Sequence, residues 1–418
     1  METKNPNIKT DAIQGPMAFL VASLVFLCLA SAWLALRPGL LLDPKIGPES
    51  IGWIYLSVYG FALSGVYGLV YRSVPLAFGV TLYSTPFVIL HFAFHLIGLL
   101  ILGLAAFNPE SPNVVMGQTF LACGAVTFIV NISSSLKREA RPDESVAFLV
   151  TAMLWLGIML VVGIPFAGSP FIKFFANSMW GSATLELGIA GVILNVILGL
   201  ALRISSMHLS STVERTNTPW FAFVLVNSGA AWLFAATAFG PPAFVLFCLG
   251  IYMAGVLVYI ARFTSILEHR ADWDLGWDSK ILYTALWMIP VCLLMFGFTV
   301  WERHIGNEPS VRSESATLVA FILGACVPGL ISLFFQSSLL LRQPTQEVRL
   351  SGQVLLAAFF NYATGVLLLI PGIWLGIEKM ATLGALFLTI GTLGFLFHFI
   401  YMFRPATADS IQRAPHAA

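Results

Sequence analysis

Long apolar runs separated by short polar segments make up most of the chain between residues 17 and 403. Each run is close to the ~20 residues that a helix needs to cross a hydrocarbon core about 30 Å thick. We therefore predict twelve membrane-spanning helices, over residues 17–37, 51–72, 82–106, 113–135, 146–168, 178–206, 218–239, 242–266, 280–301, 315–341, 350–375 and 381–403. The predicted fold class is an all-α, polytopic membrane protein. It forms one transmembrane domain over 1–418, without a soluble domain.

Composition supports a membrane location. Of the 418 residues, 58% are hydrophobic and only 10% are charged, whereas soluble proteins carry about 25% charged residues. The first run, Met17 to Leu36, is too long and too weakly basic upstream for a cleaved signal peptide, so we interpret it as the first membrane helix. The expected partner is the lipid bilayer. A formal net charge of +1 gives no reason to expect nucleic acid.

The distribution of basic residues predicts the orientation. Fifteen of the 21 Lys and Arg residues fall on one side of the predicted topology, at the two termini and the loops after even-numbered helices. Basic residues concentrate on the cytoplasmic side of membrane proteins. We therefore expect a multi-pass protein of the cell (cytoplasmic) membrane with both termini in the cytoplasm.

A short phrase recurs along the chain. GLVYR (68–72) is followed by GLALR (199–203) and, more faintly, by GLISL (329–333). The offsets between the starting positions, 199 − 68 = 131 and 329 − 199 = 130, are almost equal. A regular spacing of this kind indicates an internal repeat. It predicts three pseudo-repeated blocks of about four helices each, over 15–145, 146–279 and 280–404.

Ionisable residues at membrane depth are the main functional candidates, because a charge there is costly. His91 and His95 lie in the middle of the third predicted helix and, at i and i+4, share one face. They could bind one metal ion, or either could be an axial haem ligand. The alternative is that each hydrogen-bonds a neighbouring helix.

Glu186 is the second candidate. An unpaired carboxylate in its predicted position, in the outer half of the sixth helix, costs ~2.5 kcal/mol or more. Glu186 is therefore expected to be protonated, paired or facing water, and it could relay protons or bond His91 or His95. Alternatively, Trp180 marks the membrane interface and Glu186 is simply hydrated near it.

Basic residues end two of the predicted helices. Arg72 and Arg203 lie where snorkelling and the helix C-terminal dipole favour a cation. A contact with a haem propionate or a lipid phosphate is the minority interpretation. His208 and His398 are predicted to be interfacial, and the mixed-charge segment 268–278 is predicted to be a solvated loop.

Other site chemistry has no sequence support. The five cysteines all lie inside apolar runs, and none forms a CxxC pair or a metal-ligand spacing. The chain lacks GxxxxGK[ST], HExxH and GxSxG motifs. No catalytic residue and no metal site can be assigned from these patterns.

Three segments resemble a known family. GFALSGVYGLVYRSVP (60–75), LHFAFHLIGLLILGLA (90–105) and ELGIAGVILNVILGLALRISSM (186–207) resemble subunit I of the haem–copper oxidase superfamily and its NnrS-like relatives. The resemblance implies twelve helices, both termini inside, and threefold pseudo-symmetry in arcs of four helices. It also implies histidine metal ligands on the second, sixth and tenth helices.

The chain departs from this family at the ligand positions. The second helix begins with Trp53 and Tyr55 where a haem-ligating histidine belongs, the sixth reads WGSATLE (180–186), and the tenth contains no histidine. Copper is therefore not expected, and neither is oxygen or nitric-oxide reduction. A single haem b, bound through His91 or His95, is the one cofactor that the resemblance leaves open.

The resemblance thus predicts a non-catalytic or haem-carrying membrane protein linked to respiratory, nitrogen-oxide or metal physiology. Whether the chain is an enzyme stays open, with the missing ligands favouring no. One alternative is a secondary transporter or channel for a small solute, with helix breaks at 163–165, 327–329 and 371–372. The other is a structural subunit that packs against other membrane subunits.

Overall fold

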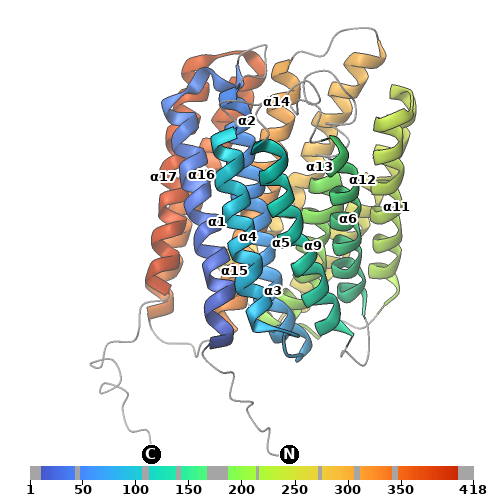
Figure 1. Cartoon of the computed structure of the whole chain (residues 1–418), viewed down its shortest axis with the longest axis vertical. Helices are drawn as coiled ribbons and strands as arrows, with labels where there is room; N and C mark the ends of the chain where they lie inside the picture. Colours follow the sequence, from blue (N-terminus) through green and yellow to red (C-terminus); the bar gives the residue numbers. More distant parts are fainter. Residues whose placement is uncertain are drawn as a thin grey trace, which may run out of the picture.

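The computed structural model describes residues 11–42, 48–105, 113–137, 143–166, 187–212, 216–271, 275–305, 311–340 and 347–402. Within these ranges the regular structure is helical throughout, and no strand occurs. The long helices run roughly side by side, and α1 begins at the same end of the bundle at which α17 ends (Figure 1). We call this the terminal end.

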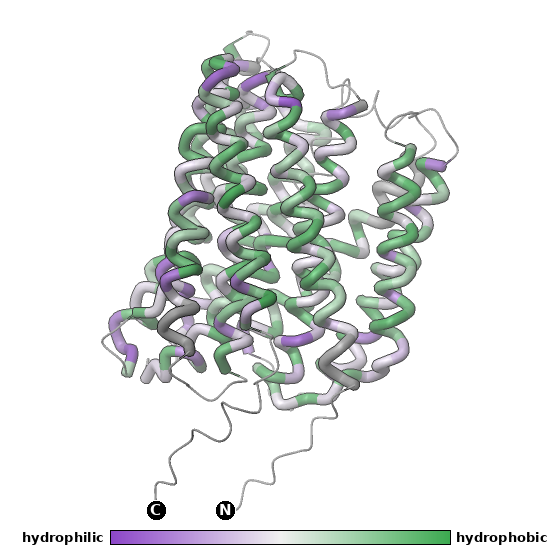
Figure 2. The backbone as a smooth tube through the Cα atoms, turned by 90° about the vertical axis from the view of Figure 1, so that its left-hand side faces the viewer, coloured by the Kyte–Doolittle hydropathy of each residue, from purple (hydrophilic) through white to green (hydrophobic). Residues whose placement is uncertain are grey.

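Twelve continuous helices make up the bundle within the described ranges. Nine of them are single α-helices: α1 (Asp11–Leu36), α4 (Thr85–Ala105), α5 (Asn113–Leu136), α6 (Glu144–Phe166), α11 (Thr218–Phe239), α12 (Pro242–Glu268), α13 (Trp277–His304), α16 (Glu347–Leu375) and α17 (Glu378–Met402). Eleven of the twelve are long and apolar enough to cross a membrane, and α6 is apolar over Glu144–Met159. Hydrophilic residues lie mostly toward the ends of the bundle (Figure 2). The predicted all-α, multi-pass fold is confirmed.

The other three helices are composite, because each combines α-helical and π-helical turns. Inner helix 2 consists of α2 (Pro48–Ile54), η2 (Tyr55–Leu63) and α3 (Ser64–Phe78). Inner helix 6 consists of η3 (Leu187–Ile193), α9 (Leu194–Leu200), η4 (Ala201–Ser205) and α10 (Ser206–His208). Inner helix 10 consists of α14 (Val311–Val319), η5 (Ala320–Cys326) and α15 (Val327–Leu339).

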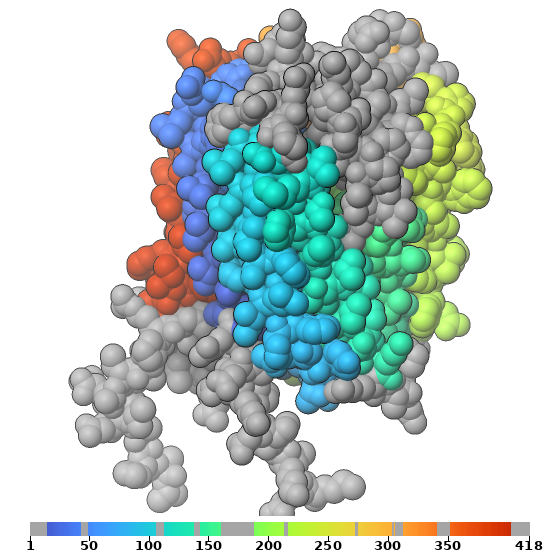
Figure 3. All heavy atoms as spheres, viewed as in Figure 1, coloured from blue at the N-terminus to red at the C-terminus, as the bar shows by residue number. Residues whose placement is uncertain are grey.

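The composite helices form the centre of the molecule. The nine α-helices contact one another in a closed ring, in the order α1, α4, α5, α6, α11, α12, α13, α16, α17 and back to α1. The three inner helices contact one another inside this ring. Their apolar cores are 89% buried, against 33–44% for the eight outer helices long enough to span. On the face shown in Figure 3, side chains of α1, α4 and α5 lie side by side.

In each inner helix one π-helical segment (η2, η3 or η5) has a backbone carbonyl that accepts a hydrogen bond from an outer helix. Ser23 Oγ donates to Phe61 O at 2.9 Å, and the hydroxyl of Tyr252 donates to Ala190 O at 3.3 Å. The hydroxyl of Tyr362 donates to Leu323 O at 2.5 Å. A π-helical turn disturbs the regular hydrogen-bond ladder, and a carbonyl in lipid must still be satisfied within the protein. These three donors therefore fasten the inner helices to the ring.

One predicted helix end and two predicted helix breaks need correction. Inner helix 2 does not end at Arg72 but continues through Pro75 to Phe78, and Gly79 ends it in the left-handed conformation (φ 67°). The predicted breaks at Pro328 and Pro371 are also wrong. Pro328 lies at the start of α15, directly after a π-helical segment, and the helix continues through both prolines.

The three predicted blocks remain a prediction. Each would contain one inner helix as its second helix, and the π-helical segments η2, η3 and η5 end at Leu63, Ile193 and Cys326. The offsets between these ends, 193 − 63 = 130 and 326 − 193 = 133, are close to those of the recurring sequence phrase. This regularity agrees with the predicted repeat but does not by itself establish one.

Candidate polar site at the terminal end

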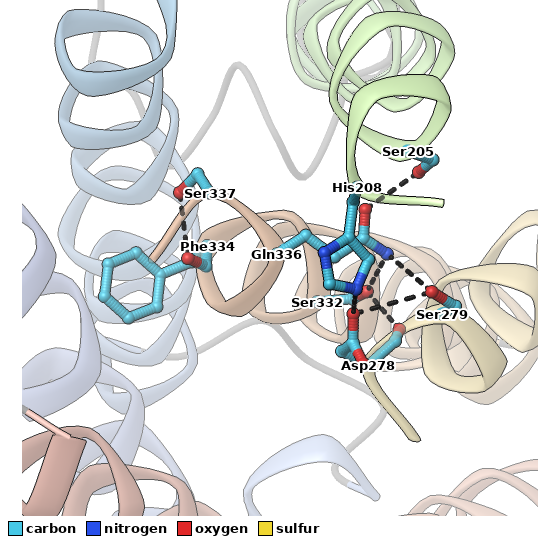
Figure 4. Close-up of polar contacts among 8 residues, drawn as sticks. All are labelled: Ser205, His208, Asp278, Ser279, Ser332, Phe334, Gln336 and Ser337. Atoms are coloured by element: carbon cyan, nitrogen blue, oxygen red, sulfur yellow. Dashed lines mark hydrogen bonds and ion pairs between the residues drawn. The ribbon is translucent and has the colours of Figure 1, made fainter. Parts of the chain in front are cut away.

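The most connected group of polar side chains in the described ranges lies at the terminal end, where inner helix 6, inner helix 10 and the start of α13 meet (Figure 4). At its centre, His208 Nε2 lies 3.0 Å from Asp278 Oδ2. The side chain of Asp278 is 7% exposed and that of His208 is 19% exposed. The pair is therefore largely removed from solvent, with the imidazole as its more accessible member.

The ends of two helices create this pair. His208 is the last residue of inner helix 6, and Asp278 lies in the first turn of α13. The partial negative charge at a helix C-terminus favours an imidazolium, and the partial positive charge at an N-terminus favours a carboxylate. The pair therefore joins the C-terminal end of inner helix 6 to the N-terminal end of α13.

Inner helix 10 joins this pair to a wider network. Ser332 Oγ donates to the backbone carbonyl of Asp278. Gln336 Nε2 lies 3.4 Å from Ser279 Oγ, and Gln336 Oε1 accepts a hydrogen bond of 2.8 Å from Ser205 Oγ. The bonds thus connect inner helix 6 to α13, α13 to inner helix 10, and inner helix 10 back to inner helix 6. We call the residues of this closed ring the terminal-end network: Ser205, His208, Asp278, Ser279, Ser332 and Gln336.

His95 and His91 lie together between α4, inner helix 2 and α5, with ring centroids 6.1 Å apart. Both are buried. His95 Nε2 lies 2.9 Å from Ser64 Oγ and 3.1 Å from the carbonyl oxygen of Tyr59. Because Tyr59 belongs to the π-helical segment η2, His95 acts as one more donor from the outer ring to an inner helix.

His91 is enclosed by aromatic rings. Its Nδ1 lies 3.2 Å from the hydroxyl of Tyr71, and its Nε2 has no hydrogen-bond partner among the described residues. The ring centroids of Tyr67 and Phe19 lie 4.3 and 4.7 Å from that of the imidazole. The backbone of α5 closes the remaining side, because a Cβ added at Gly124 would lie 3.0 Å from His91 Cδ2.

This packing does not fit a haem. Axial ligation by His95 through Nε2 would remove its bonds to Ser64 and Tyr59. Ligation by His91 would require the macrocycle to occupy the space of Phe19, Tyr67 and the α5 backbone. Among the described residues, no group of three or more His, Cys, Asp or Glu side chains could hold a metal ion.

The two predicted arginines are both engaged within the protein. Arg203 pairs with Asp143 at 3.3 Å and donates through Nε to the carbonyl of Ala77 at 2.9 Å. Arg72 lies in the middle of α3, where one guanidinium nitrogen is 2.9 Å from Met17 Sδ and the group sits over the ring of Phe334. Their contacts tie inner helices to their neighbours, and the two do not converge on one ligand.

Glu186, the third ionisable candidate, lies outside the described residues, as does Trp180. Its predicted approach to His91 or His95 therefore stays a prediction. His398 is only 2% exposed, and its ring packs edge-on against Phe335 with the centroids 4.6 Å apart, so it faces the protein interior near the end of α17. Its predicted depth at the membrane interface stays a prediction. The periodicity of an all-apolar helix does not show which face is turned inward, so the sequence could not place this residue.

Sequence reasoning missed the terminal-end network. His208 was expected at the interface and the segment 268–278 was expected to be solvated, yet Asp278 is buried against inner helix 10. The available signal was the run of small polar residues in an apolar helix: Ser332, Gln336, Ser337 and Ser338 all lie on one inner helix and are buried. Such residues in a membrane helix require partners.

The fold and the buried polar network define a multi-pass α-helical membrane protein. The chain matches no family model and no curated protein sequence.

Proposed function

We propose that this chain is a non-catalytic component of a membrane assembly, with the helix arrangement of haem–copper oxidase subunit I but without a metal centre. In that family the metal ligands lie on the second, sixth and tenth helices. Here the helices with those ordinal numbers form the buried centre of the bundle. This agreement in arrangement supports the proposal, together with the similarity of segments 60–75, 90–105 and 186–207 to that family.

One observation carries the non-catalytic part: apolar side chains fill the space where the inner helices face their neighbours. A hollow of about 20 Å³ is lined by Phe61 and Gly65 of inner helix 2, Leu330 and Phe334 of inner helix 10, and residues of α1. A second, of about 10 Å³, lies between inner helices 2 and 6, α5 and α6. Neither of these two hollows, each near the volume of one water molecule and walled by apolar side chains, has room for a cofactor.

We place the protein in the cytoplasmic membrane with both termini in the cytoplasm. The excess of Lys and Arg at the terminal end and in the loops on that side supports this orientation. The terminal-end network would then face the cytoplasm.

Mass measurement of the protein from its native membrane tests the proposal. After mild detergent extraction and affinity purification of the full chain, we expect native mass spectrometry to find it bound to at least one other membrane polypeptide in fixed stoichiometry. The complex between the chain and this polypeptide must also be recovered when the ionic strength is raised with the same detergent and lipids. A chain that is recovered only as a free monomer would contradict a role as an assembly component.

Transport of a small solute is a second candidate, supported by the π-helical segments in all three inner helices. Such segments occur often at functional sites, and unwound membrane helices commonly line transport pathways. Proteoliposomes containing the full chain would then exchange a solute or dissipate an imposed proton gradient faster than empty vesicles. Equal rates in both would remove this candidate.

A further inference from the structure

We propose that the terminal-end network is a proton-binding site that fastens inner helix 6 to α13 and inner helix 10 while His208 carries its second proton. The ligand is the proton itself, and the acceptor is the imidazole of His208, paired with Asp278. This inference concerns the helix ends and is independent of any partner in the proposed assembly.

Geometry supplies the first argument. The imidazole Nε2 and the carboxylate Oδ2 are 3.0 Å apart, a distance at which an imidazolium donates a charge-assisted hydrogen bond. A hydrogen bond to a charged group is stronger than one between neutral groups. Loss of the proton therefore weakens the contact that joins inner helix 6 to α13.

Accessibility supplies the second argument. Asp278 is nearly covered, whereas His208 keeps 19% of its side-chain surface exposed. Protons from solvent can therefore reach the imidazole without unfolding the bundle. Histidine is also the side chain whose unperturbed titration falls between pH 5 and 8.

The network transmits the change to a third helix. Ser332 and Gln336 of inner helix 10 bond the backbone of Asp278 and the hydroxyl of Ser279. Gln336 also holds Ser205, which lies one turn before His208. Neither Ser332 nor Gln336 titrates, so they act as fixed partners on either side of the His208–Asp278 pair.

The other charged groups near His208 are engaged by other groups or exposed. Arg270, just after α12, donates to the carbonyl oxygen of Leu267. On its own helix, Arg203 pairs with Asp143. On α13, Lys280 lies over the ring of Trp277 at 4.5 Å. No second carboxylate from these elements is hydrogen-bonded or ion-paired to His208 among the described residues.

The end of α12 is the remaining neighbour. The segment after His208 pairs with it through Thr212 N to His269 O at 3.2 Å and Ala271 N to Leu209 O at 3.2 Å. Glu268 and His269 there are exposed, and the His269 ring bonds the carbonyl of Ser265 on its own helix. His269 is therefore a suitable control for a titrating histidine in the same region.

Hydrogen–deuterium exchange of the full chain in nanodiscs tests the inference. Exchange rates are first corrected for the intrinsic pH dependence of exchange. Amides in 200–209 and 277–283 should then be about ten-fold more protected at pH 5.5 than at pH 8, because the hydrogen bond between His208 and Asp278 is stronger while the imidazole is charged. In His208→Gln and Asp278→Asn proteins this difference should disappear. In His269→Gln it should remain.

A His208→Gln protein that keeps the wild-type pH difference would overturn the inference. Should both network variants fail to fold, the wild-type protein still decides the question through its histidine-ring NMR signals. The His208 signal is then assigned by elimination, from single substitutions of the other six histidines, His269→Gln among them. A buried ring signal that shifts reversibly between pH 5 and 9, together with the exchange difference, supports the site. A ring signal of His208 that stays constant over this range contradicts it.

Discussion

Individual hydrogen bonds decide how the inner helices are held. Three hydroxyls and the imidazole of His95 reach across to carbonyls of the central π-helical segments, among them Ala190 O and Leu323 O. A buried acceptor that loses its partner costs about 1–3 kcal/mol. This explains why tyrosines and a histidine lie on helices that otherwise face lipid with apolar side chains.

We predict that Tyr252→Phe and Tyr362→Phe each lower the free energy of unfolding by about 1–2 kcal/mol, because each leaves a carbonyl of an inner helix without its donor. Reversible denaturation in mixed detergent micelles would measure the change. Tyr83→Phe is the matched control, since Tyr83 is half exposed just before α4 and should change stability little. Equal changes in the free energy of unfolding for all three substitutions would contradict a stabilising role of the two hydroxyl hydrogen bonds.

Residue partners across helices were beyond sequence reasoning. His208 and Asp278 lie far apart in the sequence, and each has other polar residues within a few positions, so both looked like ordinary interfacial residues. Their pairing depends on which helix ends meet, and that is set by packing around inner helix 10. The pair His91 and His95 was recognised correctly as sharing a face, but the aromatic enclosure around His91 comes from α1, inner helix 2 and α5.

At the scale of elements, small residues let neighbouring outer helices approach closely. Along α16 and α17, a Cβ added at Gly391 would lie 2.5 Å from the backbone nitrogen of Tyr362. Along α11 and α12, a Cβ at Gly255 would lie 2.7 Å from the nitrogen of Val226. Close contact of this kind is a main source of helix association in lipid, where the hydrophobic effect is weak.

We predict that Gly391→Ala destabilises the protein by about 1–3 kcal/mol, because a methyl group there collides with backbone that cannot move aside. Gly103→Ala provides the comparison: it also lies in an outer helix, but its added Cβ meets nothing within 4 Å. Thermal unfolding of the two variants side by side measures the difference. The packing account fails if Gly103→Ala is the more destabilising change.

Helix number and approximate position were predictable because they follow from run length and hydropathy alone. The π-helical segments were not, because they depend on donors supplied by other helices, such as Ser23 for Phe61. The predicted end of inner helix 2 at Arg72 was also wrong, because the helix continues through Pro75. A proline within the last turn does not end a helix when its own carbonyl accepts the closing bond, here from Gly79 N at 3.0 Å.

At the scale of the whole molecule, a ring of nine helices encloses three in the part of the chain that the structure describes. The outer ring presents large apolar side chains such as Leu104, Leu294 and Phe360 to the surroundings, as a lipid-facing surface requires. The centre is packed with valine, leucine and phenylalanine instead of polar ligands. This apolar centre is the basis of the proposed non-catalytic role.

An absorption spectrum, oxidised and dithionite-reduced, tests this account most directly. It would be recorded on the full chain purified in mild detergent from haem-replete cells, with metal analysis of the same sample and His91→Ala and His95→Ala proteins beside it. We predict no Soret band and no metal in stoichiometric amount in any of the three. A Soret band in the wild-type protein that is lost in either variant would contradict the account and establish a haem on α4.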